Sequence, residues 1–294
     1  MSPPKKIIVL IIVFLLTTEA ISRIYISRKM DTSLWDPTQR LRSSLSFKKI
    51  VQMPAFDSTV FRVLVLSSSP LLPHKNDFNK EFIKQLNRPH VKIFNISFSG
   101  KTALQNYYEY KLLSEINFNF VLLYQGANEF KKMWDHNFDL LILNHPESIF
   151  ISTPLALHYL LIEFLPGPFR SILQPETNPF TAFKGIISLS NKKKEKLVVA
   201  TFAKYITEEN SWIQRTDSAG QNIMPVNYYN NPNVINNKLD SFNRFILNLS
   251  SPYLTVIDAD KIIPKEKKYF LDWCHFTKEG TLTLIHSIVS RANN

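Results

Sequence analysis

Three short apolar runs, separated by segments with helical periodicity, constrain the fold of this chain more than any other feature. The runs occupy residues 61–66, 91–96 and 120–124, and each is rich in Val, Ile, Leu or Phe. A strand buried on both faces of a sheet reads as such a continuous run. Between the runs, apolar side chains recur at helical spacing over 78–86 and 104–116. The order strand, helix, strand, helix, strand indicates a parallel sheet with right-handed crossovers.

The C-terminal half continues the same alternation. Residues 197–202 and 254–258 are further β-branched apolar runs, and residues 234–249 carry an apolar helical stripe. A last helix is expected to begin near Thr277, a favourable N-cap residue. The sequence therefore predicts the α/β class: a three-layer α/β/α sandwich with a central parallel sheet of about five strands. With 294 residues, 45% of them hydrophobic, the chain is long enough for one large domain of this kind.

Small polar residues follow each of the first three predicted strands. Residues 67–69 are three serines, residues 97–100 read Ser-Phe-Ser-Gly, and residues 125–129 read Gln-Gly-Ala-Asn-Glu. Loops at the carboxyl ends of parallel strands are where ligand sites form. Three candidate site loops are therefore expected at one edge of the sheet.

Near the C-terminus, Asp272 precedes His275 by three residues, just ahead of the last predicted helix. A serine-nucleophile site needs a base and a group that holds this base in one tautomer, and an Asp-x-x-His turn supplies both. Cys274 beside His275 raises the alternative of Cys/His catalysis, but neighbouring residues on a turn rarely point together. Because Cys274 is the only cysteine, neither an intramolecular disulfide nor a cysteine-based zinc site is expected. The remaining histidines show no metal-ligand spacing.

With these segments placed, the chain resembles the SGNH/GDSL-type hydrolases, whose four sequence blocks it carries in order. The matching segments are Val63–Ser69, Asn95–Thr102, Gly126–Glu129 and Asp272–His275. Ser67 and Ser68 stand where the family has Gly followed by Asp or Gly, and Glu129 replaces the final Asp of the third block. The resemblance covers about residues 61–294, with 130–190 poorly anchored. It implies the flavodoxin-like fold of that family.

The resemblance also implies a role for each site residue. Ser69 is expected to be the nucleophile, His275 the general base, and Asp272 the group that orients His275. The backbone N–H groups of Ser69 and Gly100, with the side-chain amide of Asn128, are expected to form the oxyanion hole. The family pattern implies neither a metal ion nor a cofactor.

Several alternatives remain open at the level of sequence. The serine triplet reads equally as a polar turn, Asn128 as a turn residue, and His275 as the neighbour of a helix N-cap. Ser68 is an alternative to Ser69 as the nucleophile. The expected function is a serine esterase that hydrolyses an O-acyl ester, on a carbohydrate or lipid, through an acyl-enzyme. An O-acyltransferase on the same machinery is one alternative. A catalytically inactive binding module, favoured by the Ser-Ser-Ser block, is another.

The N-terminus has the pattern of a membrane-targeting segment. Lys5 and Lys6 precede an unbroken apolar run over residues 7–16, which is typical of a signal peptide or signal-anchor. We expect an uncleaved transmembrane helix within residues 1–28, with the catalytic domain on the extracytoplasmic, periplasmic side, and the start resembles membrane-anchored bacterial members of the family. A cleaved signal peptide and a buried core helix are the alternatives.

The charge distribution agrees with a membrane surface as partner. The net charge is +11, and residues 1–50 hold nine Lys/Arg against three Asp/Glu, a net charge of +6. No nucleic-acid-binding motif occurs, so nucleic acid is not an expected partner. Residues 29–59 are expected to be a linker and 60–294 the hydrolase-like domain. Within it, the proline-broken aromatic stretch 130–190 is interpreted as core helices, a cap over the site, or a membrane-contacting surface.

Overall fold

The computed structural model describes residues 58–98, 101–130, 179–206 and 232–292, with isolated residues nearer the N-terminus. The chain divides into two compact units, and the labelled helices and strands belong to the unit formed by Leu45–Asp135 and Asn178–Asn294. The other unit, Met1–Ser44 with His136–Thr177, lies almost wholly outside the described residues. The predicted domain boundaries therefore stay predictions.

Five parallel strands form a single sheet in the order β2-β1-β3-β4-β5. Their bounds are β1 Phe61–Ser67, β2 Val91–Asn95, β3 Phe120–Tyr124, β4 Lys196–Ala200 and β5 Leu254–Ile257. All four strand pairs are parallel, which confirms the predicted five-stranded sheet. The pleat sends alternate side chains to opposite faces. Val63 and Val65 join one core cluster, while Leu64 and Leu66 join the other.

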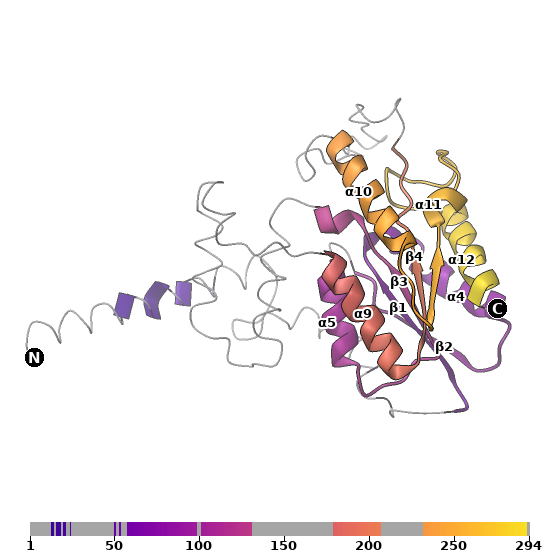
Figure 1. Ribbon diagram of the computed structural model, residues 1–294, viewed down its shortest axis with the longest axis horizontal. Helices are drawn as coiled ribbons and strands as arrows, with labels where there is room; N and C mark the ends of the chain where they lie inside the picture. Colours follow the sequence, from indigo (N-terminus) through magenta and orange to yellow (C-terminus); the bar gives the residue numbers. More distant parts are fainter. Residues whose placement is uncertain are drawn as a thin grey trace, which may run out of the picture. The chain divides into compact units, whose positions relative to one another are not determined.

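Helices cover both faces of this sheet, as Figure 1 shows. Their bounds are α4 Lys75–Leu86, α5 Ala103–Leu112, α9 Pro179–Lys193, α10 Pro232–Leu247, α11 Ala259–Ile262 and α12 Lys278–Ala292. Helices α4 and α12 pack on the face of Val63 and Val65, and helices α5 and α9 pack on the face of Leu64 and Leu66. Helix α10 contributes side chains to both clusters. The predicted three-layer α/β/α sandwich is thereby confirmed.

Helix α5, predicted from an i, i+4 apolar stripe, buries polar as well as apolar side chains. Of that stripe, Tyr108 is buried, whereas Leu112 is 41% exposed. The polar side chains of Asn106 and Glu109 are also buried. Each has a polar partner close by: Asn106 donates to Gln125, and Glu109 pairs with Lys101. A burial pattern set by polar partners does not follow hydrophobic periodicity.

The stretch 130–190 is partly described. The short 3-10 helix η2, Ala127–Phe130, ends at its start, and α9 begins at Pro179. Phe183 and Ile186 of α9 are fully buried in the core, so this part of the stretch is a core helix. Residues 131–178, on which the cap and membrane-contact interpretations fall, lie outside the described residues.

Ile50, inside the segment predicted as a linker, is fully buried in the core of the sandwich. Nearer the N-terminus, residues 1–12 and many of those up to 28 lie outside the described residues. Within the part of the chain that is described, no helix combines the length and apolar character needed to cross a membrane.

Candidate functional site

The strand order predicts a site at the carboxyl edge of the sheet, between β1 and β3. Helix α4 connects β1 to β2 on one face, and α5 returns to β3 on the other face. The chain leaves β1 toward β2 and leaves β3 toward β4, in opposite directions along the sheet. Ligands bind at the carboxyl edge at such a switch point. Ser67, the last residue of β1, pairs in register with Tyr124, the last residue of β3. The loops after β1 and β3 therefore start side by side.

The turn from Leu271 to His275 has its ends tied together. Phe270 and Phe276 form an antiparallel bridge, and the N–H of Leu271 donates to the carbonyl of His275 at 2.7 Å. Thr277 then accepts the N–H of Gly280 on its hydroxyl at 3.2 Å. This bond confirms the predicted N-cap of the last helix. The turn is therefore hydrogen-bonded at both ends, which favours a fixed geometry for Asp272 and His275.

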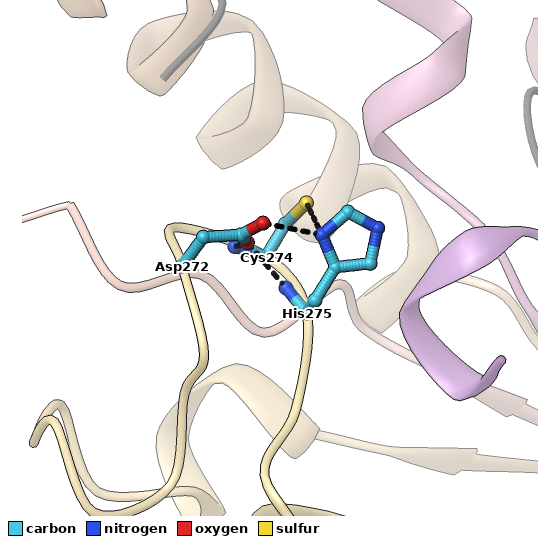
Figure 2. A group of neighbouring side chains, drawn as sticks. All are labelled: Asp272, Cys274 and His275. Carbon is cyan, nitrogen blue, oxygen red and sulfur yellow. Dashed lines mark hydrogen bonds and ion pairs between the residues drawn. The ribbon is translucent and has the colours of Figure 1, made fainter. Parts of the chain in front are cut away.

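Asp272 and His275 form a hydrogen-bonded pair within this turn. Nδ1 of His275 lies 2.6 Å from Oδ2 of Asp272, and Oδ1 accepts the N–H groups of Cys274 and His275, both at 2.8 Å. Because an ionised carboxylate only accepts, Nδ1 carries the hydrogen and the lone pair lies on Nε2. Figure 2 shows the edge of the ring that carries Nε2 turned away from Asp272. The arrangement presents a base with its orienting group already in place.

The charge state of Asp272 follows from its contacts. Partial burial acts to raise its pKa, because desolvation disfavours the carboxylate. The hydrogen bond and charge of His275, with the two backbone N–H groups, outweigh that effect, so the pKa lies below its usual value. Asp272 is therefore ionised at neutral pH, as an orienting carboxylate must be.

Cys274 points toward the same imidazole, contrary to the expectation that neighbouring side chains on the turn diverge. Its Sγ lies 3.6 Å from Nδ1 of His275, and the three donor atoms of Asp272, Cys274 and His275 all lie within 4.8 Å of one another (Figure 2). These are the residue types that bind zinc, so this trio is where the described chain could hold a metal ion. Nδ1 of His275 is already hydrogen-bonded to Asp272. The trio therefore matches an oriented base more closely than a set of metal ligands.

An aromatic platform joins the Asp272–His275 turn to the ends of β3 and β4. Tyr124 stacks on Phe202 with ring centroids 5.6 Å apart and lies 5.8 Å from Phe276. The ring of Phe202 also lies 6.4 Å from Trp273. The N–H of Tyr205 donates to the carbonyl of Trp273 at 2.7 Å. Since Tyr124 pairs with the last residue of β1, this platform brings the turn to the edge where the serine triplet begins.

The three serines differ in their surroundings. Ser67 ends β1 and is fully buried. The Ser68 hydroxyl is also buried, and it has no hydrogen-bond partner among the described residues. Ser69 is half-buried and begins the 3-10 helix η1, Ser69–Leu71, with Pro70 in its first turn. Proline suits that position, because its missing N–H would have no helical partner there. Of the three hydroxyls, that of Ser69 is therefore the most accessible.

Asn128 lies on η2, at the carboxyl edge beyond β3, and is almost fully buried. Its Nδ2 donates to the carbonyl oxygen of Lys101 at 2.9 Å. Gln125 donates to the same oxygen at 2.5 Å. Because a side-chain amide carries two hydrogens, Asn128 retains a second donor. Gly100, the other predicted oxyanion residue, lies outside the described residues.

Glu129, where the family pattern has Asp, has a clear local role. Its Oε1 accepts the N–H of Ala103, the first residue of α5, and Nε2 of Gln125, both at 2.7 Å. A carboxylate at a helix N-terminus is favoured by the unpaired N–H groups and by the helix dipole. Thr102 and Gln105 complete this end of α5 with a capping box. The substitution therefore keeps the loop after β3 tied to α5.

A buried polar group that sequence reasoning missed lies beside these contacts. The Lys101 side chain is 1% exposed and forms an ion pair with Glu109 of α5, itself 5% exposed. Nζ of Lys101 also donates to the carbonyl of Ile96 at 2.8 Å. Desolvation lowers the pKa of Lys101 and raises that of Glu109, each opposed by the other's charge. The sequence offered one usable clue, an acidic residue on α5 between two inward-facing tyrosines.

Gly126, in the third block, is required by close packing. A Cβ atom there would fall far inside van der Waals contact with the Phe202 ring and its Cβ. Phe202 is fully buried and belongs to the aromatic platform, so the ring has no open space into which to move. The glycine therefore allows the loop after β3 to lie directly against the loop after β4.

Comparison with known proteins finds likeness at the level of fold. An acetylxylan esterase from Geobacillus stearothermophilus is 9% identical, with a TM-score of 0.49 over 82% of this chain and 97% of that protein. A GDSL-like lipase from Bacteroides thetaiotaomicron is 11% identical, with a TM-score of 0.46 over 87% and 98%. A psychrotrophic esterase from Pseudoalteromonas sp. is 13% identical, with a TM-score of 0.41 over 80% and 100%. No family model and no curated protein matches the sequence.

Proposed function

We propose that this protein is a serine esterase that hydrolyses an O-acyl ester through an acyl-enzyme on Ser69. The observation that carries the proposal is the 2.6 Å contact between Asp272 and His275. It fixes the tautomer that leaves Nε2 as a base. The proposal that this base serves Ser69 is supported by the aromatic platform, which joins the turn to Tyr124, the register partner of Ser67. An O-acylated carbohydrate or lipid is the proposed substrate class.

The reaction follows from the positions of the protons. Nε2 of His275 takes the proton of the Ser69 hydroxyl as Oγ attacks the acyl carbon, and then gives it to the leaving alcohol. Water attacks the acyl-enzyme next, transferring a proton to Nε2, and the acid departs as Ser69 regains its hydrogen. Asp272 stays ionised throughout and stabilises the imidazolium that forms in each half-reaction.

Charge develops on the acyl oxygen in both tetrahedral intermediates. We assign its stabilisation to the backbone N–H of Ser69, the N–H of Gly100 and the second hydrogen of the Asn128 amide. The contact of Asn128 with the carbonyl of Lys101 supports this role, because it fixes the amide while one N–H remains for the substrate. Losing one such donor typically lowers kcat by about 10²–10³-fold.

Exposure favours Ser69 over Ser68 as the nucleophile. Ser68 is completely buried, whereas Ser69 is accessible from solvent at the start of η1. Ser68 directly precedes the proposed nucleophile, at the position where the resembled family carries Asp or Gly.

The proposal is tested by measuring hydrolysis of 4-nitrophenyl acetate and labelling by a fluorophosphonate probe. Wild-type protein should turn over the ester and become labelled on Ser69, and Ser69→Ala should lose both properties while remaining folded. Ser68→Ala serves as the matched control and should keep most activity. Undiminished turnover by folded Ser69→Ala, or absence of labelling in folded wild-type protein, would refute the assignment.

We further propose that residues 1–28 anchor this esterase to a membrane, with the catalytic domain on the extracytoplasmic side. The support lies in the sequence: two lysines precede a ten-residue apolar run, and basic residues are in excess over the first 50 positions. A membrane-tethered esterase meets substrates held at that surface, which suits lipids and envelope-associated glycans.

A further inference from the structure

We propose that the buried Lys101–Glu109 ion pair is a positioning device that sets the Asn128 amide for oxyanion binding. This inference rests on the proposed function and deepens it. It assigns a role at the same site to two residues that are not among the proposed catalytic and oxyanion-binding residues. Lys101 is the positioning residue, acting through Asn128.

Lys101 connects three separate segments. Its Nζ donates to the carbonyl of Ile96, just beyond β2, at 2.8 Å, and ion-pairs with Glu109 on α5. Its backbone carbonyl accepts Nδ2 of Asn128 at 2.9 Å and Nε2 of Gln125 at 2.5 Å. The side chain therefore bridges the ends of the loop 96–101, and the main chain of the same residue holds the amide. A shift of Lys101 moves Asn128 with it.

A second lysine supports the same loop. Lys75, at the start of α4, donates from Nζ to the carbonyl of Ser97 at 3.5 Å. The side chain of Asn95 accepts both the N–H of Ser97 at 3.1 Å and the Ser97 hydroxyl at 2.5 Å. The carbonyls of Ile96 and Ser97 are thus each held by an ammonium group as the chain leaves β2.

The energetics of burial argue for positioning over stability. Desolvating an ammonium and a carboxylate costs about as much as their attraction returns, so apolar side chains of similar volume are often equally stable or better. What apolar side chains cannot supply is a directional donor to the carbonyl of Ile96. The Lys101–Glu109 pair is expected to add little net stability. We therefore attribute its presence to the position in which it holds the loop beside Asn128.

The chain offers a matched control at the opposite edge of the sheet. Lys193, where α9 ends before β4, ion-pairs with Glu195 at 2.8 Å and is 7% exposed. Its Nζ also donates to main-chain carbonyls, those of Ile116 at 2.6 Å and Leu113 at 3.3 Å. The two lysines thus share their burial, a carboxylate partner and carbonyl acceptors. They differ in position: Lys101 lies in the loop after the carboxyl end of β2, whereas Lys193 lies before the amino end of β4, away from the loops that carry the proposed site.

The test measures the fluorophosphonate acylation rate constant, kcat and KM for 4-nitrophenyl acetate, and Tm, in full-length protein. Lys101→Met/Glu109→Leu removes both charges at similar volume and should keep Tm within a few degrees. We expect its acylation rate constant and kcat to fall on the order of 10–100-fold, because small misplacement of an oriented group has effects of that size. KM should change little. Lys193→Met/Glu195→Leu should leave acylation near the wild-type rate.

Asn128→Ala decides whether the pair acts through the amide. If it does, adding Lys101→Met/Glu109→Leu to Asn128→Ala should slow acylation much less than it slows the wild-type protein, since coupled residues are non-additive. Undiminished acylation in the folded double variant, or fully multiplicative effects with Asn128→Ala, would overturn the inference. Should that variant not fold, Lys101→Leu/Glu109→Met offers the same apolar volume and is read in the same way.

Ser69→Ala separates this inference from the proposed function. If Ser69→Ala retains labelling and turnover, the esterase assignment itself fails, whatever the Lys101 variants do. If Ser69→Ala is inactive while Lys101→Met/Glu109→Leu acylates normally, the esterase assignment stands and only the positioning role fails.

Discussion

The two oxygens of Asp272 serve different partners, and this division explains how one short turn fixes a base. Oδ1 accepts the N–H groups of Cys274 and His275, while Oδ2 contacts Nδ1 of His275. The backbone bonds hold the carboxylate plane, and the carboxylate then holds the ring. Because all of these groups lie within four residues, the geometry depends little on distant packing. This locality is also why the pair could be predicted from sequence.

Replacing Asp272 with Asn tests the orienting role. Asn offers an oxygen for the backbone N–H groups but presents an N–H toward Nδ1, which favours the wrong imidazole tautomer. We expect Asp272→Asn to fold and to lose on the order of 10³–10⁴-fold in kcat for 4-nitrophenyl acetate. Asp258→Asn, which alters the N-cap of α11 after β5, is the control and should keep its activity. A loss of less than tenfold in Asp272→Asn would contradict the role.

The lowered pKa of Asp272 also predicts a pH dependence of stability. A carboxylate whose pKa is lower in the folded protein stabilises it above the unfolded pKa, about 3.9. This contribution disappears as the pH falls through the folded value. The free energy of unfolding of wild type should therefore exceed that of Asp272→Asn at neutral pH, and the difference should shrink below about pH 4. Urea unfolding at a series of pH values measures this difference, and a gap that widens toward acid would contradict the assignment.

Cys274 is the residue most easily mistaken for a nucleophile. Its Sγ lies beside Nδ1 of His275, the nitrogen that Asp272 holds, and not beside Nε2. A thiol in that place cannot give its proton to the lone pair that serves as base. Cys274→Ala should therefore retain kcat within about threefold, in contrast to the loss of one proposed catalytic group. Mass spectrometry of the labelled protein provides the second measurement, and a probe adduct on Cys274 would overturn this interpretation.

At the scale of elements, the loops after β3 and β4 depend on one close approach. Gly126 lies against Phe202, whose ring contacts those of Tyr124 and Trp273. The glycine therefore couples the loop that carries Asn128 to the turn that carries His275. This coupling joins segments that are far apart in sequence, and glycine is the residue that permits it.

Gly126→Ala is expected to disturb both stability and activity. The added methyl group overlaps the base of a fully buried ring, and such overpacking typically costs about 1–3 kcal/mol. Gly185→Ala on α9 is the matched control, because the atoms nearest to its Cβ, at 2.7 Å and beyond, belong to the half-buried ring of Tyr107, which can turn aside, and alanine favours the helix. We expect Gly126→Ala to lower both Tm and kcat, and Gly185→Ala to change kcat little. Equal effects of the two changes on kcat would contradict the coupling.

Within the sandwich, the elements differed in how well the sequence predicted them. Strand β3 begins and ends where predicted, because its five residues are buried on both faces and bounded by polar loops. Helix α5 forms as predicted, but the burial of its Glu109 was not foreseen, since Glu109 is buried through Lys101 and not through apolar packing. For the region of α9, a core helix was one of three interpretations that the sequence left open, beside a cap and a membrane-contacting surface. Apolar content alone does not distinguish a core helix from a cap.

The same physical distinction applies to the site as a whole. The Asp272–His275 pair and the polar strand ends are local patterns, so their positions along the chain could be predicted. The network through Lys101, Glu109 and Gln125 joins three segments by polar contacts, and no periodicity marks it. Contacts between polar residues far apart in sequence become visible only when the fold brings them together. The assignment of Ser69 stays a prediction that the labelling experiment tests.

At the scale of the whole chain, the proposed anchor predicts how the full-length protein fractionates. Expressed in bacteria, it should sediment with membranes, resist alkaline carbonate and dissolve in detergent, with an N-terminus that begins before residue 28. Leu10→Lys/Val13→Lys should release it, because each charge at the centre of a membrane helix costs about 2.5–3.5 kcal/mol of insertion. The control Leu247→Lys adds a charge at an exposed site on α10 and should stay membrane-bound. Recovery of intact wild-type protein in the soluble fraction would contradict anchoring, and an N-terminus created by cleavage near residue 20 would indicate a signal peptide.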